Sequence, residues 1–93
     1  MNELEQARQE IDRIDRQMAA LFEERMQAVG RVALYKQQND LPILDGGREA
    51  LVIEKNRALI NEPDLRDLYE EYIRFQMALS RRYQARLLGR ESD

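Results

Sequence analysis

Residues 3 to 38 contain no proline and a single glycine, Gly30. Apolar residues recur through this segment at spacings of mostly three and four, which is the spacing of one face of an α-helix. They are Leu4, Ala7, Ile11, Ile14, Met18, Leu21, Ala28, Val32 and Tyr35. The pattern predicts one unusually long helix of about 35 residues.

The length of this helix has a consequence for assembly. At 1.5 Å per residue, a helix of about 35 residues is roughly 50 Å long. A compact chain of 93 residues has a radius of gyration of only about 12 Å, so the helix extends beyond any globule that its own chain can form. The apolar stripe continues into this overhang, and a second copy of the chain is the simplest way to bury it. We therefore expect an intertwined homodimer.

A turn-rich stretch, residues 41 to 47, ends the long helix. It reads LPILDGG, and the proline, aspartate and two glycines are typical of a loop. A second, shorter helix is expected from about residue 47 to residue 61, with Asp45 or Gly46 as its N-cap.

A second break, Asn61-Glu62-Pro63-Asp64, precedes a third helix of medium length, expected over about 65 to 88 with Asp64 as its cap. The apolar stripe expected to bury this helix consists of Leu65, Leu68, Tyr72, Phe75, Leu79 and Tyr83. The sequence shows no alternation typical of strands. It therefore predicts an all-α fold of three helices, long, short and medium, with residues 1–93 forming a single domain.

Composition excludes several kinds of site. The chain has no cysteine and no histidine, so disulfides, thiol nucleophiles, histidine bases and cysteine-based zinc sites are excluded, and we expect no metal site. A formal net charge of −3 argues against nucleic-acid binding. No apolar run approaches the length that spans a membrane, and the N-terminal residues lack the apolar core of a signal peptide. We expect a cytoplasmic protein that binds no membrane.

Two cations of the long helix stand where apolar residues are expected. Arg25 falls within the apolar stripe, and a buried unpaired charge is costly. Lys36 lies eleven residues further on, which places it about 20° from Arg25 around the helix and about 16 Å away along the axis. A snorkelling side chain would account for Arg25 alone. Two cations on one partly apolar face favour an anionic ligand.

The third helix has polar residues in a second stripe formed with Ile73, Met77 and Leu87. Ser80 and Gln84 are four residues apart and therefore project from the same face. A solvated edge or an internal hydrogen-bonded pair would account for them. The alternative interpretation is a pair of neutral hydrogen-bonding groups that line a cavity.

Further candidates lie near the starts of the first two helices. Arg48 and Glu49 follow the loop directly, so the start of the second helix can add a cation and an acceptor to the same cavity, and Asp45 can cap that helix or contact a ligand. Arg8 lies about 25 Å from Arg25 along the long helix, too far to hold the same small molecule within one chain. It is either a plain surface arginine or, in an antiparallel dimer, a residue that reaches the site of the other chain.

The combined set resembles the active-site pattern of the all-helical chorismate mutases. The resemblance runs from about Leu4 to Leu88 and includes the segments EIDRIDRQMAALFEERM and VALYKQQNDLPILD and the Arg-Glu pair after the loop. The residues that match the pattern are Arg8, Arg25, Lys36, Asp45, Arg48, Glu49, Ser80 and Gln84.

The resemblance implies the isomerisation of chorismate to prephenate, an intramolecular Claisen rearrangement on the route to phenylalanine and tyrosine. This reaction requires no proton transfer, metal or other cofactor. The enzyme holds a flexible dianion in its reactive conformer and stabilises charge on the ether oxygen.

The resemblance also implies a role for each residue. Arg25 binds one substrate carboxylate, and Arg8 of the partner subunit binds the other. Lys36 and Gln84 donate hydrogen bonds to the ether oxygen. Glu49 holds the ring hydroxyl together with the backbone near Asp45. Arg48 supports the carboxylate contacts and orients Glu49, and Ser80 helps to bind a carboxylate.

Two other functions stay open at this point. Isochorismate pyruvate lyase shares the fold and acts on a nearly identical dianion, although Asp45, Ser80 and the loop length favour the mutase. A helical dimerisation module without catalytic activity would explain the long stripe equally well. It would not explain Arg25 within the stripe or the shared face of Ser80 and Gln84.

Overall fold

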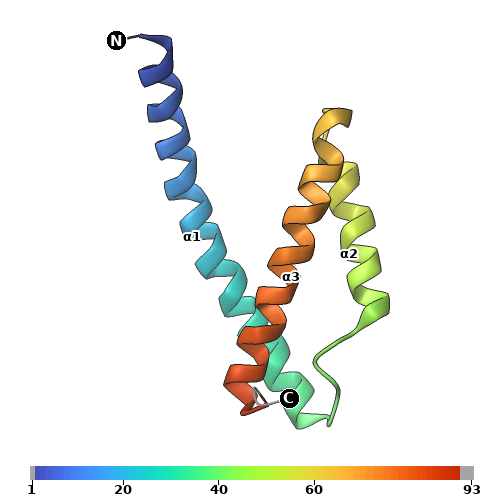
Figure 1. Ribbon diagram of the computed structural model, residues 1–93. Coiled ribbons are helices and arrows are strands. Elements are labelled where there is room, and N and C mark those ends of the chain that lie inside the picture. The colour runs from blue at the N-terminus through green and yellow to red at the C-terminus, as the bar shows by residue number, and fades with distance from the viewer. Residues whose placement is uncertain (1, 91–93) are drawn as a thin grey trace.

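The computed structural model describes residues 2–90, and these form three α-helices with one short 3₁₀ turn. Helix α1 spans Glu3–Gln38, α2 spans Gly46–Leu59 and α3 spans Arg66–Leu88, with the 3₁₀ turn η1 at Pro63–Leu65 (Figure 1). The all-α class and the order long, short, medium are thus confirmed. Within the described residues, no helix is both long and apolar enough to cross a membrane.

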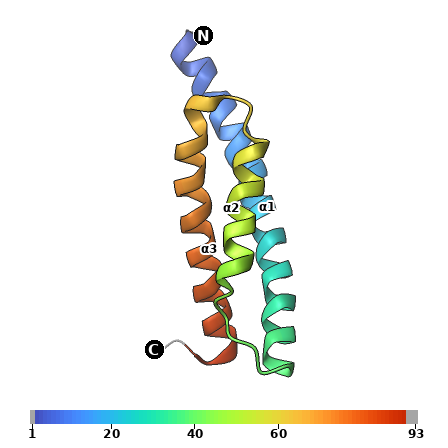
Figure 2. The ribbon, with the colours of Figure 1, turned by 90° about the vertical axis from the view of Figure 1, so that its right-hand side faces the viewer.

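Helix α3 is the central element, because it contacts both α1 and α2. It packs against the C-terminal half of α1, and α2 runs antiparallel along it (Figures 1 and 2). The N-terminal half of α1 diverges from α3 and stands clear of the other helices. The described chain therefore measures 55 × 25 × 21 Å, and its radius of gyration is 16.5 Å. A compact chain of this length would have a radius of about 12 Å.

Local sequence explains the limits of α1. The side chain of Asn2 accepts a hydrogen bond from the backbone N–H of Glu5 at 2.8 Å, which caps the first turn. At the other end, Asp40 adopts a left-handed conformation with φ of 53°. The N–H of Leu41 then donates to the carbonyl of Lys36 at 2.8 Å, which closes the helix with a Schellman-type bond. Helix α1 thus ends where the chain must turn towards the site.

Helix α2 begins as expected, because the side chain of Asp45 accepts from the N–H of Arg48 at 3.1 Å. It ends at Leu59, two residues earlier than predicted. The expected cap of the third helix is wrong. Asp64 lies inside the 3₁₀ turn, and α3 begins at Arg66 after Leu65, with no capping bond from a side chain.

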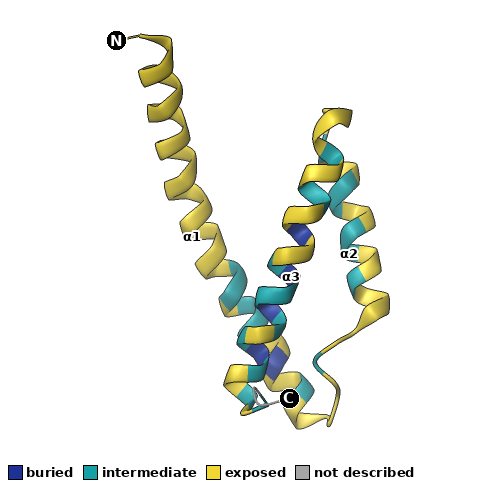
Figure 3. Ribbon diagram, viewed as in Figure 1, coloured by how far each residue is buried: buried dark blue, intermediate teal, exposed yellow. Residues whose placement is uncertain are grey.

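The apolar stripe predicted to bury α3 is also wrong for the single chain. Leu68 is 61% exposed and Phe75 is 66% exposed, whereas the second stripe supplies the buried residues of α3. These buried residues are Ile73, Met77, Ser80 and Gln84, and Ala33 of α1 completes the small core. Figure 3 shows the buried positions gathered on α3 and the lower part of α1, while the upper half of α1 is exposed throughout. In one chain, α3 therefore buries its second stripe, which includes Ser80 and Gln84, and leaves its most apolar face exposed.

Candidate active site

A pocket of about 280 Å³ lies where the C-terminal halves of α1 and α3 meet the start of α2. Seven of the eight residues predicted from the sequence line it, and they come from all three helices and the loop. They are Arg25, Lys36, Asp45, Arg48, Glu49, Ser80 and Gln84. Its apolar walls are Ala28, Val29, Val32, Ile43, Val52 and Met77, and Arg81 completes the lining. The arrangement combines charged groups with apolar walls, as expected of a site for a small ionic ligand.

Arg25 is held by the first of the two polar residues of α3. Its Nη1 donates to the hydroxyl of Ser80 at 2.6 Å, and that hydroxyl donates to the carbonyl of Gln76 at 3.0 Å. Ser80 is 6% exposed, so the contact is protected from water. The bond fixes one arm of the guanidinium, and the planar fork retains other N–H groups for a carboxylate. Ser80 therefore orients Arg25 in the pocket.

Lys36 is positioned by two acceptors on different elements. Its Nζ donates to the carbonyl of Ile43 at 2.5 Å and to Oε1 of Gln84 at 3.1 Å. An ammonium group has three protons, so a third donor remains for a ligand. Because Gln84 uses its carbonyl oxygen as the acceptor, its amide NH₂ is the donor that it can offer. Lys36 and Gln84 together supply two adjacent donors.

The first turn of α2 supplies charges of both signs. Arg48 and Glu49 both line the pocket, and Asp45 lines it while capping the helix. Glu49 forms an ion pair with Arg81 of α3, in which Nη1 of Arg81 lies 2.6 Å from both carboxylate oxygens. Arg81 was not among the residues predicted from the sequence. Its position beside Ser80 and within one turn of Gln84 was the available signal.

Arg8 is the one predicted residue that the single chain does not bring to the pocket. It is exposed on the diverging half of α1, seventeen residues before Arg25, which corresponds to about 25 Å along the helix. The pocket of one chain is therefore assembled without it.

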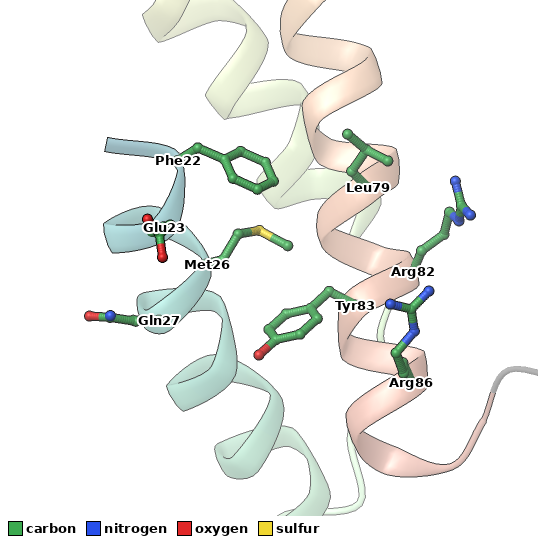
Figure 4. A pocket seen from close by; sticks show the side chains of 8 residues that line it. All are labelled: Phe22, Glu23, Met26, Gln27, Leu79, Arg82, Tyr83 and Arg86. Atoms are coloured by element: carbon green, nitrogen blue, oxygen red, sulfur yellow. The ribbon is translucent and has the colours of Figure 1, made fainter. Parts of the chain in front are cut away.

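A larger cleft of about 450 Å³ opens between α1 and α3, and its lining is different. Figure 4 shows Phe22 and Met26 of α1 pointing towards Leu79 and Tyr83 of α3, with Arg82 turned away from α1. None of the eight predicted residues lines it. Its size alone does not make it the site, because charged groups converge on the smaller pocket. The large cleft combines four apolar and aromatic residues with Glu23, Gln27, Arg82 and Arg86.

The sequence matches the family described as "Chorismate mutase type II" over residues 7–85. The match includes most of α1 and α3, all of α2, and every residue of the pocket lining. The chain belongs to the type II chorismate mutase family. Membership confirms the resemblance inferred from the residues and assigns the chain to a family of isomerases.

Among curated proteins, the chain is similar to the T-protein of Haemophilus influenzae, with 33% identity over 75 residues. The aligned region covers 80% of this chain and 20% of that relative, so the chain spans about a fifth of the relative's length. No solved structure gives a significant match. The roles of individual residues in this chorismate mutase domain stay predictions.

Proposed function

We propose that this chorismate mutase domain isomerises chorismate to prephenate in the pocket between its three helices, as a step towards phenylalanine and tyrosine. The observation that carries the proposal is the convergence of Arg25, Lys36 and Arg48 with Gln84 on one partly apolar pocket. The substrate is a small dianion with an ether oxygen and a ring hydroxyl. Cations, neutral donors and apolar walls match these groups.

Carboxylate binding is assigned to the two arginines with Ser80. Arg25, held by Ser80, presents its remaining N–H groups to one carboxylate, and the planar fork of arginine matches that group. Arg48 lies at the start of α2, where the helix dipole also favours an anion, and it supports the same contacts. These interactions hold the flexible substrate in its compact, reactive conformer.

Stabilisation of the transition state is assigned to Lys36 and Gln84. As the carbon–oxygen bond of the ether breaks and the new carbon–carbon bond forms, negative charge develops on the ether oxygen. The third N–H of Lys36 and the amide NH₂ of Gln84 are the donors proposed to meet it. This contact strengthens in the transition state, so it raises kcat and not only the affinity. The scheme needs neither a proton transfer nor a cofactor.

Glu49 is the acceptor proposed for the ring hydroxyl, assisted by the backbone near Asp45. Glu49 lies in the first turn of α2 and lines the pocket from the side of the loop. A carboxylate has about four acceptor sites, so it can bind a hydroxyl while paired with an arginine. This contact fixes the orientation of the ring.

The functional form is proposed to be an intertwined homodimer, in which Arg8 of the partner subunit binds the second carboxylate. The exposed apolar residues on the diverging half of α1 and along α3 support this assembly. The second carboxylate of the substrate also requires a cation, and Arg8 of the same chain is too far away to supply it. This requirement supports the same assembly. In an isologous pair, each chain lends Arg8 and receives it.

The test is to incubate the purified protein with chorismate and follow the loss of its enol-ether absorbance, with a parallel incubation with isochorismate. We expect prephenate from chorismate. Release of pyruvate from isochorismate with no prephenate from chorismate would replace the mutase by the lyase of the same fold. No turnover of either compound would favour the non-catalytic dimerisation module.

A further inference from the structure

Arg81 lines the pocket, and it has no part in the chemistry proposed so far. It lies on α3 directly after Ser80, and its side chain is 34% exposed. A single nitrogen, Nη1, lies 2.6 Å from both oxygens of Glu49, whose side chain is 24% exposed. The pair joins the start of α2 to α3 within the lining of the pocket.

We propose that Arg81 is a positioning residue that holds the carboxylate of Glu49 in place to accept the ring hydroxyl of the substrate. The proposal rests on the proposed function, because it refines the role given to Glu49. It differs from a direct substrate contact, since Arg81 acts here through Glu49.

Geometry supports this role. Glu49 lies in the first turn of α2, two residues after Gly47, and its side chain has three rotatable torsions. The ion pair with Arg81 restricts those torsions from a neighbouring helix that is already packed in the core. Because Nη1 of Arg81 engages one side of the carboxylate, the lone pairs on the other side remain for a hydroxyl.

Charge supports it as well. A carboxylate in a pocket for a dianion repels the ligand, and the repulsion is strong where water is partly excluded. The described lining holds four cations, Arg25, Lys36, Arg48 and Arg81, and two carboxylates, Asp45 and Glu49, which leaves a formal charge of +2. Without Arg81 that charge falls to +1. Arg81 therefore offsets the charge of the hydroxyl acceptor and preserves the stronger attraction for the dianionic substrate.

The first experiment compares chorismate turnover by wild type, Arg81→Ala and Arg81→Lys. We expect Arg81→Ala to lower kcat/KM about 10- to 100-fold, the effect of losing a hydrogen bond to a charged group. The loss should appear mainly as a higher KM, because the hydroxyl gains no charge in the transition state. Arg81→Lys should recover part of it. Arg82→Ala is the matched control, since it removes the same charge from the next position of α3 but outside the pocket.

The second experiment adds Arg81→Ala to Glu49→Gln. If Arg81 acts through Glu49, the double variant should be within about 3-fold of Glu49→Gln alone, because the two residues form one unit. Losses that multiply would overturn the proposal in favour of a direct contact between Arg81 and a substrate carboxylate. If Arg81→Ala lowered the melting temperature but left the kinetics unchanged, the proposal would also be overturned. The ion pair would then only stabilise the packing of α2 against α3.

The failure of this proposal can be distinguished from failure of the proposed function. Wild-type turnover that Arg81→Ala leaves unchanged would remove the role of Arg81 and keep the mutase. Absence of turnover by the wild type would remove both.

Discussion

At the scale of single residues, Lys36 is both a structural link between two elements and a proposed donor to the substrate. Its Nζ bridges Ile43 of the loop and Gln84 of α3, so one side chain orders the loop and aims the proposed donor pair. Arg25 and Ser80 form an equivalent couple one turn of α3 earlier. Each donor is thus oriented by a neighbour before any ligand binds.

Lys36→Ala should lower kcat on chorismate at least about 100-fold, because it removes a donor to the oxygen on which charge develops. Steady-state kinetics measures the loss, and circular dichroism and size-exclusion chromatography check that helicity and assembly persist. Lys55→Ala is the matched control, since Lys55 is the other lysine of the chain and lies exposed on α2. Equal kcat for wild type and Lys36→Ala would contradict the role given to Lys36.

The sequence alone does not tell whether Gly46 and Gly47 are required for the turn before α2. Both lie in the first turn of α2, neither has a positive φ, and a Cβ at Gly46 would meet nothing within 4 Å. The helix therefore does not require glycine there, although the pair resembles a flexible turn in the sequence.

Gly46→Ala should stabilise the protein by roughly 0.5 kcal/mol, because alanine loses less backbone entropy on folding. Thermal unfolding should show a melting temperature higher by a few degrees. Gly89→Ala provides the opposite case, since Gly89 has φ of 68° at the end of α3, where a Cβ is strained. Destabilisation by Gly46→Ala would show that the start of α2 needs the freedom of glycine.

At the scale of elements, an ion-pair network fastens the end of α2 to the start of α3. Arg57 of α2 lies 2.7 Å from Asp67 and 2.9 Å from Glu70, and Glu70 also pairs with Arg74 at 2.8 Å. The hydrogen bond from Arg74, aided by Arg57, lowers the pKa of Glu70, while the hydrogen bond with Asp67 raises the pKa of Arg57. None of these four residues lines the pocket, so we expect the network to affect stability more than the chemistry.

Glu70→Gln should therefore show a loss of stability that depends on pH. A lowered folded-state pKa means that ionised Glu70 stabilises the fold above its unfolded pKa of about 4.3, and that this contribution is lost as the pH falls through the folded value. Urea unfolding should show a gap between wild type and variant at pH 7 that narrows below about pH 4. Glu71→Gln, an exposed neighbour on α3, controls for removal of a charge. A gap that stays constant from pH 7 to pH 3 would contradict the ion-pair explanation.

The sequence predicted the elements well and their faces less well. The apolar period located all three helices within a few residues, and Asp45, one of the two residues expected to cap α2, is its cap because its side chain acts locally. The face of α3 that packs in the single chain was misjudged, since its polar stripe lies in the core and Phe75 is exposed. A periodic pattern identifies apolar faces but does not tell which neighbour covers each face. Arg81 was missed for the same reason, because its partner Glu49 lies 32 residues away.

At the scale of the whole molecule, one chain leaves much of its apolar surface uncovered. The diverging half of α1 and the outer face of α3 expose Leu4, Ile11, Ile14, Met18, Leu68, Tyr72 and Phe75. Such extended exposed apolar surface is typical of an interaction site. The overhang of the long helix was predicted from its length alone. The proposed contact with a partner subunit follows from the need to bury this exposed apolar surface.

Two inactive variants should restore activity when they share a dimer. Arg8→Ala and Arg25→Ala should each abolish most turnover, since each removes a carboxylate contact from both sites. In a mixed dimer, one site receives Arg8 from one chain and keeps Arg25 of the other, so coexpression of both variants should recover about a quarter of the wild-type activity. Coexpression that recovers nothing, with dimers present by light scattering, would contradict the sharing of Arg8.

In the proposed dimer, the diverging half of α1 would also make ligand binding depend on protein concentration. On the proposed arrangement, a bound dianion touches both polypeptides and acts as a cross-bridge, so it shifts the monomer–dimer equilibrium by mass action. Specific activity should then fall on extreme dilution, and an unreactive dicarboxylate should slow that fall. If the proposed dimer forms, the substrate itself contributes to the stability of the assembly that the unsupported half of α1 requires.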